Sequence, residues 1–480
     1  MSECIETESN QAVGKKSLGI LSIVLLVVAT TGPISILLSS IPLSIGFGNG
    51  IGVPAVYVML GLVYLLFSFG FSAMSTRIRN GDSFFRYVAH GLGQNSGMSA
   101  AFIALVSYLS LLLALYALFG QFFSDLILSK TGFHLPWWLS CALLMIVINL
   151  MSIKNIEFNG KVLGWMMVVE FIIIGLFYIF AFQDISSNSK PLAHSFAADT
   201  VFTAGIGASI VILINSFFGF ETVAIYAKDT KNPNKTIPVG LIISVITITA
   251  LYAFSAWMLI NVLGAEQVVT IAQNNPAGIW FDLYASLMHP LAADVLSLLL
   301  LTSLSAAILS YHNIASRYLY LLSDNQLLPK AFSRLHPKEQ TPVFSSRSVT
   351  LLMLFLVVLL GFALQFDAMT QVVVIAAAPT ALGIVIVQIV TNLAVMRFFQ
   401  KNKTDVGIFS RIIAPSLCVI LFLILLVTML MNLDALTGVD SWVNYLIPAS
   451  IAITAIGSMI YSKVLSKSNK GYLVPGEKHV

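Results

Sequence analysis

The sequence predicts an all-α integral membrane protein with twelve transmembrane helices. Hydrophobic residues make up 58% of the 480 residues and charged residues only 10%, whereas soluble domains have about 45–50% and about 25%. Twelve runs are apolar and long enough to cross a bilayer, which takes about 20 residues. Lysines and arginines gather in alternate connections between these runs, as in other proteins that are threaded through a membrane.

The predicted spans follow one another along almost the whole chain. They are expected near residues 18–45, 51–76, 97–129, 136–153, 160–183, 201–227, 237–263, 279–311, 346–365, 368–396, 409–432 and 442–464. The longest stretches between them, about 323–345 and 184–199, are too short for a soluble domain. The function is therefore expected to be carried out within the membrane.

The orientation of the predicted spans follows from the positive charges. The first 16 residues are polar, and the next apolar run is too long for a secretory signal and lacks a small-residue cleavage site. With the N-terminus inside, 23 of the 25 lysines and arginines lie on the cytoplasmic side, and only Lys130 and Lys190 lie outside. We therefore expect a cell-membrane protein with both termini in the cytoplasm. The net charge of +4 reflects this orientation and predicts no nucleic-acid partner.

Helix 1 is expected to be interrupted near the middle of the membrane. The stretch "ATTGPISILLSS" (29–40) places a glycine, a proline and several hydroxyl groups in an apolar run. Pro33 lacks an amide hydrogen and clashes with the preceding turn, so it ends the first half of the helix. Free carbonyls at such a break can bind an ammonium group, and free amides can bind a carboxylate.

Glu170 is the proton-coupling candidate in helix 5. It lies ten residues into the predicted helix, about 15 Å from its start and so near the midplane. An ionisable group there costs on the order of 3 kcal/mol and needs a reason. A carboxyl group out of water favours its protonated form, so it can take up and release a proton as its surroundings change. Two other interpretations stay open: a counter-charge for a cationic substrate, and a hydrogen-bonded contact between helices.

Helix 6 is expected to be broken as well. The stretch "NSFFGFE" (215–221) combines polar groups, aromatic rings, a glycine and a carboxylate within an apolar run. Unwound backbone is tolerated at this depth only where protein or a water-filled cavity surrounds it. The alternative is a kinked, continuous helix in which Glu221 caps the second half. Breaks in helices 1 and 6 would correspond if the first ten spans form two inverted five-helix repeats, an arrangement that marks the site of a secondary transporter.

Metal and enzyme chemistry are not expected. The three cysteines are scattered, and the histidines are expected in loops or at span ends without ligand spacing. The histidines are His90, His134, His194, His289, His312, His336 and His479. No nucleophile, base or metal cluster falls within the spans, so we predict no metal, no cofactor and no enzyme activity.

Two long stretches resemble one family of membrane transporters. "GFETVAIYAKDTKNPNKTIP" (219–238) resembles the signature between helices 6 and 7 of the amino acid–polyamine–organocation permease superfamily. "HNIASRYLYLLSDNQLLPKAFSRLHPKEQTPVFS" (312–345) looks like the segment after helix 8 in the same superfamily. The resemblance implies a five-plus-five inverted-repeat (LeuT-type) fold with discontinuous helices 1 and 6 and the substrate between the two breaks.

The resemblance also implies a division of the chain. Residues 1–17 and 465–480 would be cytoplasmic tails, and 18–396 would be the transporter core. Within the core, 18–183 and 201–396 would be the two repeats, and residues 409–464 would form helices 11 and 12 outside them.

Carried over by position, the resemblance assigns the substrate-binding residues to the two breaks. In helix 1 they are Thr30, Thr31, Gly32, Pro33, Ile34 and Ser35. In helix 6 they are Asn215, Ser216, Phe217, Phe218, Gly219 and Phe220, and Glu221 would cap the following half-helix. An aromatic ring often covers the substrate in this superfamily, and Phe217 or Phe220 would do so here.

Two departures from the superfamily pattern bear on the substrate. Many members carry a glycine-serine-glycine type motif in helix 1, where this chain has "TTGPIS" and offers fewer free amides to a carboxylate. Some proton-coupled members have a lysine in helix 5 that aligns near Glu170. A glutamate there would favour a basic amino acid or a polyamine.

The predicted function is secondary active transport of an amino acid or related amine through the lipid bilayer by alternating access around the two breaks. Coupling to H⁺ is favoured over Na⁺. An exchanger is one alternative, and a sodium-coupled symporter with Ser303 and Ser305 as ion ligands is another. A sensor with a transporter-like fold is a remote alternative.

Overall fold

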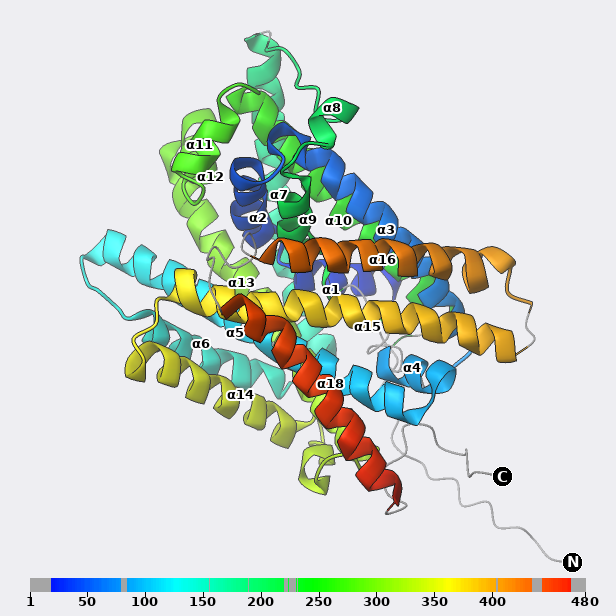
Figure 1. The fold of residues 1–480 in the computed structure, drawn as a ribbon. Coiled ribbons are helices and arrows are strands. Elements are labelled where there is room, and N and C mark those ends of the chain that lie inside the picture. The colour runs from blue at the N-terminus through cyan, green and yellow to red at the C-terminus, as the bar shows by residue number, and fades with distance from the viewer. Residues whose placement is uncertain are drawn as a thin grey trace, which may run out of the picture.

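In the computed structural model of the 480-residue chain, the regular elements of the described part are helices (Figure 1). It describes residues 19–78, 84–154, 156–188, 190–219, 223, 230, 232–402, 405–433 and 443–467. The helices of the first half are α1 (Ile20–Thr31), α2 (Pro33–Phe47), η1 (Gly50–Gly52), α3 (Val53–Ser75), α4 (Phe84–Leu92), α5 (Gln94–Thr131), α6 (Trp137–Ser152), α7 (Ile156–Ser187), α8 (Ala198–Val201), α9 (Ile206–Leu213) and η2 (Ile214–Phe217).

The second half continues with long helices. They are α10 (Pro233–Leu263), α11 (Val268–Asn274), α12 (Ile279–Leu287), α13 (Pro290–Asp324), η4 (Lys330–Ser333), α14 (Val343–Val358), η5 (Leu359–Ala363), η6 (Ala368–Val373), α15 (Val374–Lys401), η7 (Phe409–Ile413), α16 (Ala414–Met431) and α18 (Val443–Lys467). The segments η5, η6 and η7 are π-helical turns that continue into or out of their neighbours.

The helices have the length and polarity of membrane spans. In the described ranges, nine helices are long and apolar enough to cross a bilayer, and α1 and α2, bent by 43°, form a tenth if the pair is one span. Two shorter apolar helices, Trp137–Ser152 and Ile206–Phe217, lie where the sequence predicts spans 4 and 6. The chain is therefore a multi-pass membrane protein, and the count of twelve spans remains a prediction.

The helices pack in two groups that meet at the centre. In one group α3 packs on α10, α1 on α10, and α9 on both α2 and α3. In the other, α5 packs on α6 and α13, and α14 packs on α6 and α13. Helix α13 also contacts α1 and α2, so it lies where the two groups meet. Figure 1 shows α15 and α16 side by side across the front of the molecule.

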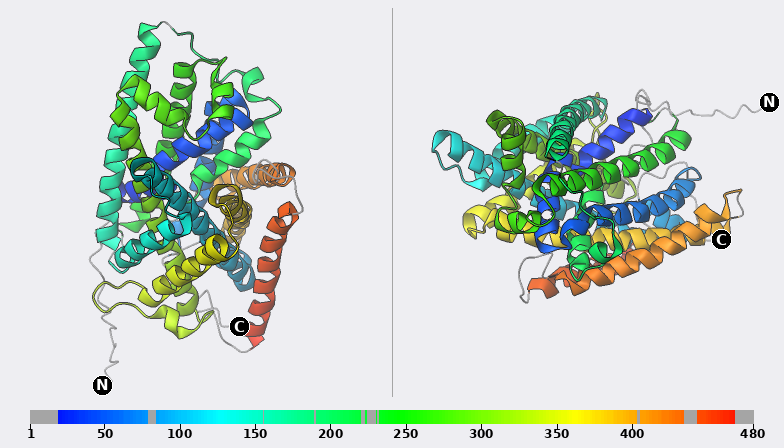
Figure 2. Two further views of the ribbon diagram at one scale, coloured as in Figure 1. Left: turned by 90° about the vertical axis from the view of Figure 1, so that its left-hand side faces the viewer. Right: turned by 90° about the horizontal axis from the view of Figure 1, so that it is seen from above.

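The final helix lies on the outside of this arrangement. Among the described elements, the stronger contacts of α18 are with α5 and α15. Figure 2 shows it at the edge of the body in the left-hand view. Large apolar side chains on its other faces, such as Ile453 and Val464, are 69% and 60% exposed in the isolated chain, as expected of surfaces that face lipid.

Predicted span 8 (279–311) is wrong at both ends. The chain forms the short helix α12, breaks at Met288 and His289, and starts α13 with Pro290 at its first position. Proline is favoured at the first turn of a helix because its missing amide has no partner there, so the new helix begins at this residue. Helix α13 then continues to Asp324 and so includes residues 312–324, which the sequence places in the following connection.

The continuation of α13 also corrects the placement of His312. The sequence predicts this histidine at a span end, but it lies inside α13 with its side chain fully buried. Beyond it, Ile314, Tyr318, Leu321 and Leu322 are buried at helical spacing against neighbouring helices. This apolar stripe keeps the segment helical although polar residues interrupt it.

Predicted span 6 (201–227) starts later than expected. Val201 ends the short helix α8, and the next helix, α9, begins only at Ile206. The lack of a side chain at Gly205 allows its backbone to pack against Gly48. A Cβ atom on Gly205 would lie 2.1 Å from the carbonyl oxygen of Gly48. A turn at this point therefore brings the connection against the end of α2.

Candidate functional site

The interruption of helix 1 is present at Gly32. Helix α1 ends at Thr31, Gly32 takes the left-handed conformation with φ +62°, and Pro33 occupies the first position of α2. Glycine adopts this conformation without the steric cost of a side chain, and proline cannot continue the preceding helix. Gly32 also packs against α13, because an added Cβ atom would lie 3.4 Å from the Cβ of Ala307. The break therefore faces α13.

The chain leaves the helical conformation again in predicted helix 6. Helix α9 is followed by the 3₁₀ turn η2, which ends at Phe217. Phe218 is extended, with φ −76° and ψ 146°, and Gly219 has φ +93°. Phe220 and Glu221 lie outside the described residues, so the predicted cover by Phe220 and the predicted cap by Glu221 remain untested.

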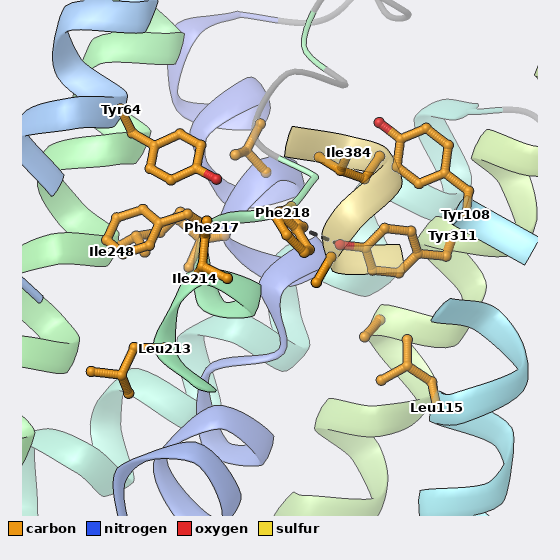
Figure 3. Close-up of a cluster of buried hydrophobic side chains, with 14 of the residues drawn as sticks. Tyr64, Tyr108, Leu115, Leu213, Ile214, Phe217, Phe218, Ile248, Tyr311 and Ile384 are labelled. Atoms are coloured by element: carbon orange, nitrogen blue, oxygen red, sulfur yellow. Dashed lines mark hydrogen bonds between the residues drawn. The ribbon is translucent and has the colours of Figure 1, made fainter. Parts of the chain in front are cut away.

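The two interruptions lie against each other and against α13. A Cβ atom on Gly219 would lie 2.5 Å from Cγ2 of Thr30 in α1 and 2.8 Å from the hydroxyl of Tyr311 in α13. The Tyr311 hydroxyl donates a hydrogen bond of 2.9 Å to the carbonyl oxygen of Phe218 (Figure 3). Segments more than 180 residues apart in sequence are thus in direct contact.

Glu170 contacts the first turn of α2, on the C-terminal side of the helix 1 break. Its side chain, in α7, is only 1% exposed. Oε2 accepts hydrogen bonds from the amide of Ile34, at 3.3 Å, and from the hydroxyl of Ser303, at 3.1 Å. Oε1 has no hydrogen-bond partner within the described part of the chain. Glu170 therefore places a carboxyl group at the first turn of α2, where free amides favour negative charge.

Hydroxyl groups tie the end of α1 to its neighbours. Thr30 Oγ1 lies 2.5 Å from the hydroxyl of Ser310 in α13, and Thr31 Oγ1 lies 2.9 Å from the hydroxyl of Tyr252 in α10. Ser35 Oγ donates to the carbonyl of Gly32 at 2.6 Å, within the first turn of α2. The side chains of Thr30, Thr31 and Ser35 are thus all engaged in hydrogen bonds.

Aromatic rings enclose the end of η2. The ring of Phe217 stacks on that of Tyr64, with centroids 4.9 Å apart and planes within 5° (Figure 3). Tyr57 lies between Phe217 and Tyr252, with ring centroids 6.4 Å and 5.5 Å away respectively, and its hydroxyl lies 3.4 Å from that of Ser216. Phe217 is fully buried in this cluster.

Asn215 contributes a buried polar group to the same turn. Its side-chain oxygen Oδ1 is buried and has no hydrogen-bond partner among the described residues. A buried amide oxygen without a partner is costly and calls for a reason, such as a ligand group that completes it. Asn215 therefore fits the predicted assignment to the binding site.

Several site residues were not predicted from the sequence. They are Tyr57, Tyr64, Tyr252, Ser310 and Tyr311. Each is a polar side chain within a predicted span, and a buried polar group in a membrane helix needs a partner. That signal could have marked them as facing the protein interior, but it could not have named the helix that each one meets.

Replacing Thr31 with valine is expected to lower the melting temperature of the purified protein by about 1–3 °C. The change leaves the buried Tyr252 hydroxyl without its partner at 2.9 Å, which costs about 1–3 kcal/mol in a chain with a large unfolding entropy. Tyr252→Phe should have a similar effect. Because the two changes remove one interaction, the double variant should melt no lower than the single variants. Melting shifts that simply add would show that the two hydroxyls are not coupled.

The arrangement suits a ligand with two opposite charges. A carbonyl at the end of η2 can accept a hydrogen bond from an ammonium group, and the amides at the first turn of α2 can bind a carboxylate. Among the described residues, no three histidine, cysteine, aspartate or glutamate side chains gather where they could hold a metal ion.

Comparison with known proteins places the chain in a family. The family model described as amino acid permease matches residues 19–469. The chain is 25% identical to the γ-aminobutyric acid permease of Bacillus subtilis over 62% of each chain. It is 28% identical to a D-serine/D-alanine/glycine transporter of Escherichia coli over 41% of this chain and 42% of the relative.

Two further relatives match over longer stretches. An aromatic amino acid transport protein of Escherichia coli is 25% identical over 69% of this chain and 72% of its own length. A serine/threonine exchanger of Bacillus subtilis is 22% identical over 70% and 75% respectively. The alignments with the first two relatives span less than two thirds of their lengths.

Proposed function

Because the chain belongs to the amino acid permease family, we propose that it is a secondary active transporter that carries an amino acid across the cell membrane. The contact between the two interruptions, where Gly219 lies against Thr30 at the end of α1, carries this proposal. Alternating access around this point would expose the site to one side of the membrane and then to the other. Amino acids fit the opposite backbone dipoles at the breaks better than amines without a carboxylate do.

We propose that protons drive the transport and that Glu170 carries them. Its carboxyl group is 1% exposed, and it forms no salt bridge with the described residues. Burying an unpaired charge is costly, so the carboxyl is expected to hold a proton when the site is closed. Opening to water would allow the proton to leave, which links proton movement to the change of access.

Sodium coupling has less support. Ser305, one of the two hydroxyls considered for a sodium site, donates to the carbonyl of Leu301 in its own helix. The other, Ser303, donates to Glu170. Exchange of one amino acid for another uses the same site, and one relative bears the name of an exchanger, so exchange remains the second proposal.

The orientation proposed from the positive charges places both chain ends in the cytoplasm. With this orientation, the connection between α13 and α14, residues 325–342, lies on the cytoplasmic side. The described part of this connection carries Lys330, Arg334 and Lys338, which fits the cytoplasmic placement.

Uptake into proteoliposomes tests the proposal. The full chain would be reconstituted and given labelled phenylalanine, serine, D-alanine, glutamate, lysine, γ-aminobutyric acid and putrescine, with and without an inward proton gradient. We expect uptake of at least one amino acid above protein-free vesicles, increased by the gradient. Uptake that does not depend on the proton gradient but requires an amino acid inside the vesicle would favour exchange. No uptake of any compound would contradict the proposal.

A further inference from the structure

Both backbone groups that would hold a substrate are already bound by side chains of the protein. The carbonyl of Phe218, beyond the end of η2, accepts the hydrogen bond of the Tyr311 hydroxyl at 2.9 Å. The amide of Ile34, in the first turn of α2, donates to Glu170 Oε2 at 3.3 Å. A donor thus occupies the position suited to an ammonium group, and a carboxyl occupies the position suited to a carboxylate.

On the basis of the proposed function, we propose that Tyr311 and Glu170 compete with the substrate by standing in for the two ends of an amino acid. An arriving substrate then displaces the Tyr311 hydroxyl from the carbonyl of Phe218 with its ammonium group. Tyr311 is therefore a positioning residue that competes with the substrate for one backbone carbonyl.

Tyr311 and the carbonyl of Phe218 lie in a closely packed part of the protein. Phe218 is fully buried and Tyr311 is 3% exposed. The hydroxyl would lie only 2.8 Å from a Cβ atom on Gly219. The Tyr311 ring also packs against Tyr108, with centroids 6.0 Å apart, which fixes its direction toward the carbonyl (Figure 3). An ammonium group would therefore take the place of the hydroxyl at the carbonyl of Phe218.

This competition would contribute to selectivity. An ammonium group forms charge-assisted hydrogen bonds, which are about twice as strong as those of a neutral hydroxyl. A carboxylic acid without an amino group has no donor that can replace the hydroxyl with a gain in binding energy. The site is therefore expected to admit ligands with an ammonium group and to stay closed to simple acids.

Tyr311→Phe provides the test, with Tyr116→Phe as the matched control. Tyr116 is also fully buried, and its hydroxyl has no hydrogen-bond partner among the described residues. Dissociation constants would be measured on the full-length protein in detergent with labelled phenylalanine, serine, D-alanine and γ-aminobutyric acid. For each compound that the wild type binds, Tyr311→Phe should lower the Kd roughly two- to tenfold, the range expected when one competing hydrogen bond is lost.

The possible results separate this inference from the proposed function. A Kd that is unchanged or higher in Tyr311→Phe, or lowered equally in Tyr116→Phe, would overturn the competition. A wild-type protein that binds none of the four amino acids would overturn the proposed function and this inference with it.

A second measurement avoids any folding defect of the Tyr311→Phe variant. A single 3-fluorotyrosine would be placed at position 311 of the otherwise wild-type chain, and its fluorine resonance would be recorded with and without saturating substrate. Displacement of the hydroxyl from the carbonyl of Phe218 predicts a shift of the resonance on binding. A resonance that does not move at saturation would overturn the proposal.

Discussion

Glu170→Gln is expected to abolish proton-driven accumulation of the substrate in proteoliposomes. Glutamine keeps the size of the side chain and can still accept hydrogen bonds from Ile34 and Ser303, which bind Oε2 at 3.3 Å and 3.1 Å. It cannot take up and release a proton in the pH range of transport. Accumulation driven by an inward proton gradient should therefore fall at least tenfold, while exchange of internal for external substrate should persist.

The persistence of exchange is the informative part of this experiment. A variant that simply misfolds loses both activities, whereas a variant that lacks only the proton carrier keeps the exchange. Asp294→Asn is a suitable control because this carboxylate is exposed, pairs with Lys130 at 2.7 Å and belongs to neither break. Gradient-driven accumulation that survives in Glu170→Gln would remove Glu170 from the coupling mechanism and leave it a contact between α7, α2 and α13.

Gly219→Ala is expected to reduce transport at least tenfold, even where the protein still folds. The residue has φ +93°, which costs a residue with a side chain about 1–3 kcal/mol. The added Cβ would also lie 2.5 Å from Cγ2 of Thr30 and 2.8 Å from the Tyr311 hydroxyl. The methyl group must therefore push apart the two breaks, where the substrate is proposed to bind.

Two other glycines separate the backbone strain from the crowding. Gly264 has φ +88° but no atom within 4 Å of an added Cβ, so Gly264→Ala introduces strain alone. Gly175 lies in α7 with open space around it, so Gly175→Ala should be neutral or slightly stabilising. Initial rates of uptake, normalised to reconstituted protein, should fall strongly only for Gly219→Ala. Equal losses for Gly219→Ala and Gly264→Ala would mean that strain, not contact with Thr30 and Tyr311, accounts for the effect.

The features that could be predicted from sequence are those encoded by a residue and its neighbours. Pro33 and Gly32 interrupt helix 1 whatever surrounds them, because proline lacks an amide and glycine accepts positive φ. The burial of Glu170 could be expected because a carboxyl group within a membrane span is costly unless it faces the protein interior. Its partners Ile34 and Ser303 could not be predicted, because they lie 136 and 133 residues away.

The errors along α13 also arise because contacts between distant segments cannot be predicted from a local pattern. The residues after position 311 include a histidine, an asparagine and an arginine, which in sequence resemble a loop. The helix nevertheless continues to Asp324, because Ile314, Tyr318 and Leu321 are buried against other helices. Only the packing of those helices decides that the segment is helical, and that packing is not visible in a local pattern.

Ser303, Ser310 and Tyr311 all lie on α13, which is one continuous helix. The first is bound to Glu170, the second lies beside Thr30, and the third is bound to Phe218. Seven residues are nearly two turns and span about 10 Å, so these contacts share one helical register. Sliding or rotating α13 would therefore weaken all three contacts together. Inserting one residue between Ser303 and Ser310 would turn the far contacts by about 100° and put them out of phase with Glu170, although no contacting residue would have changed.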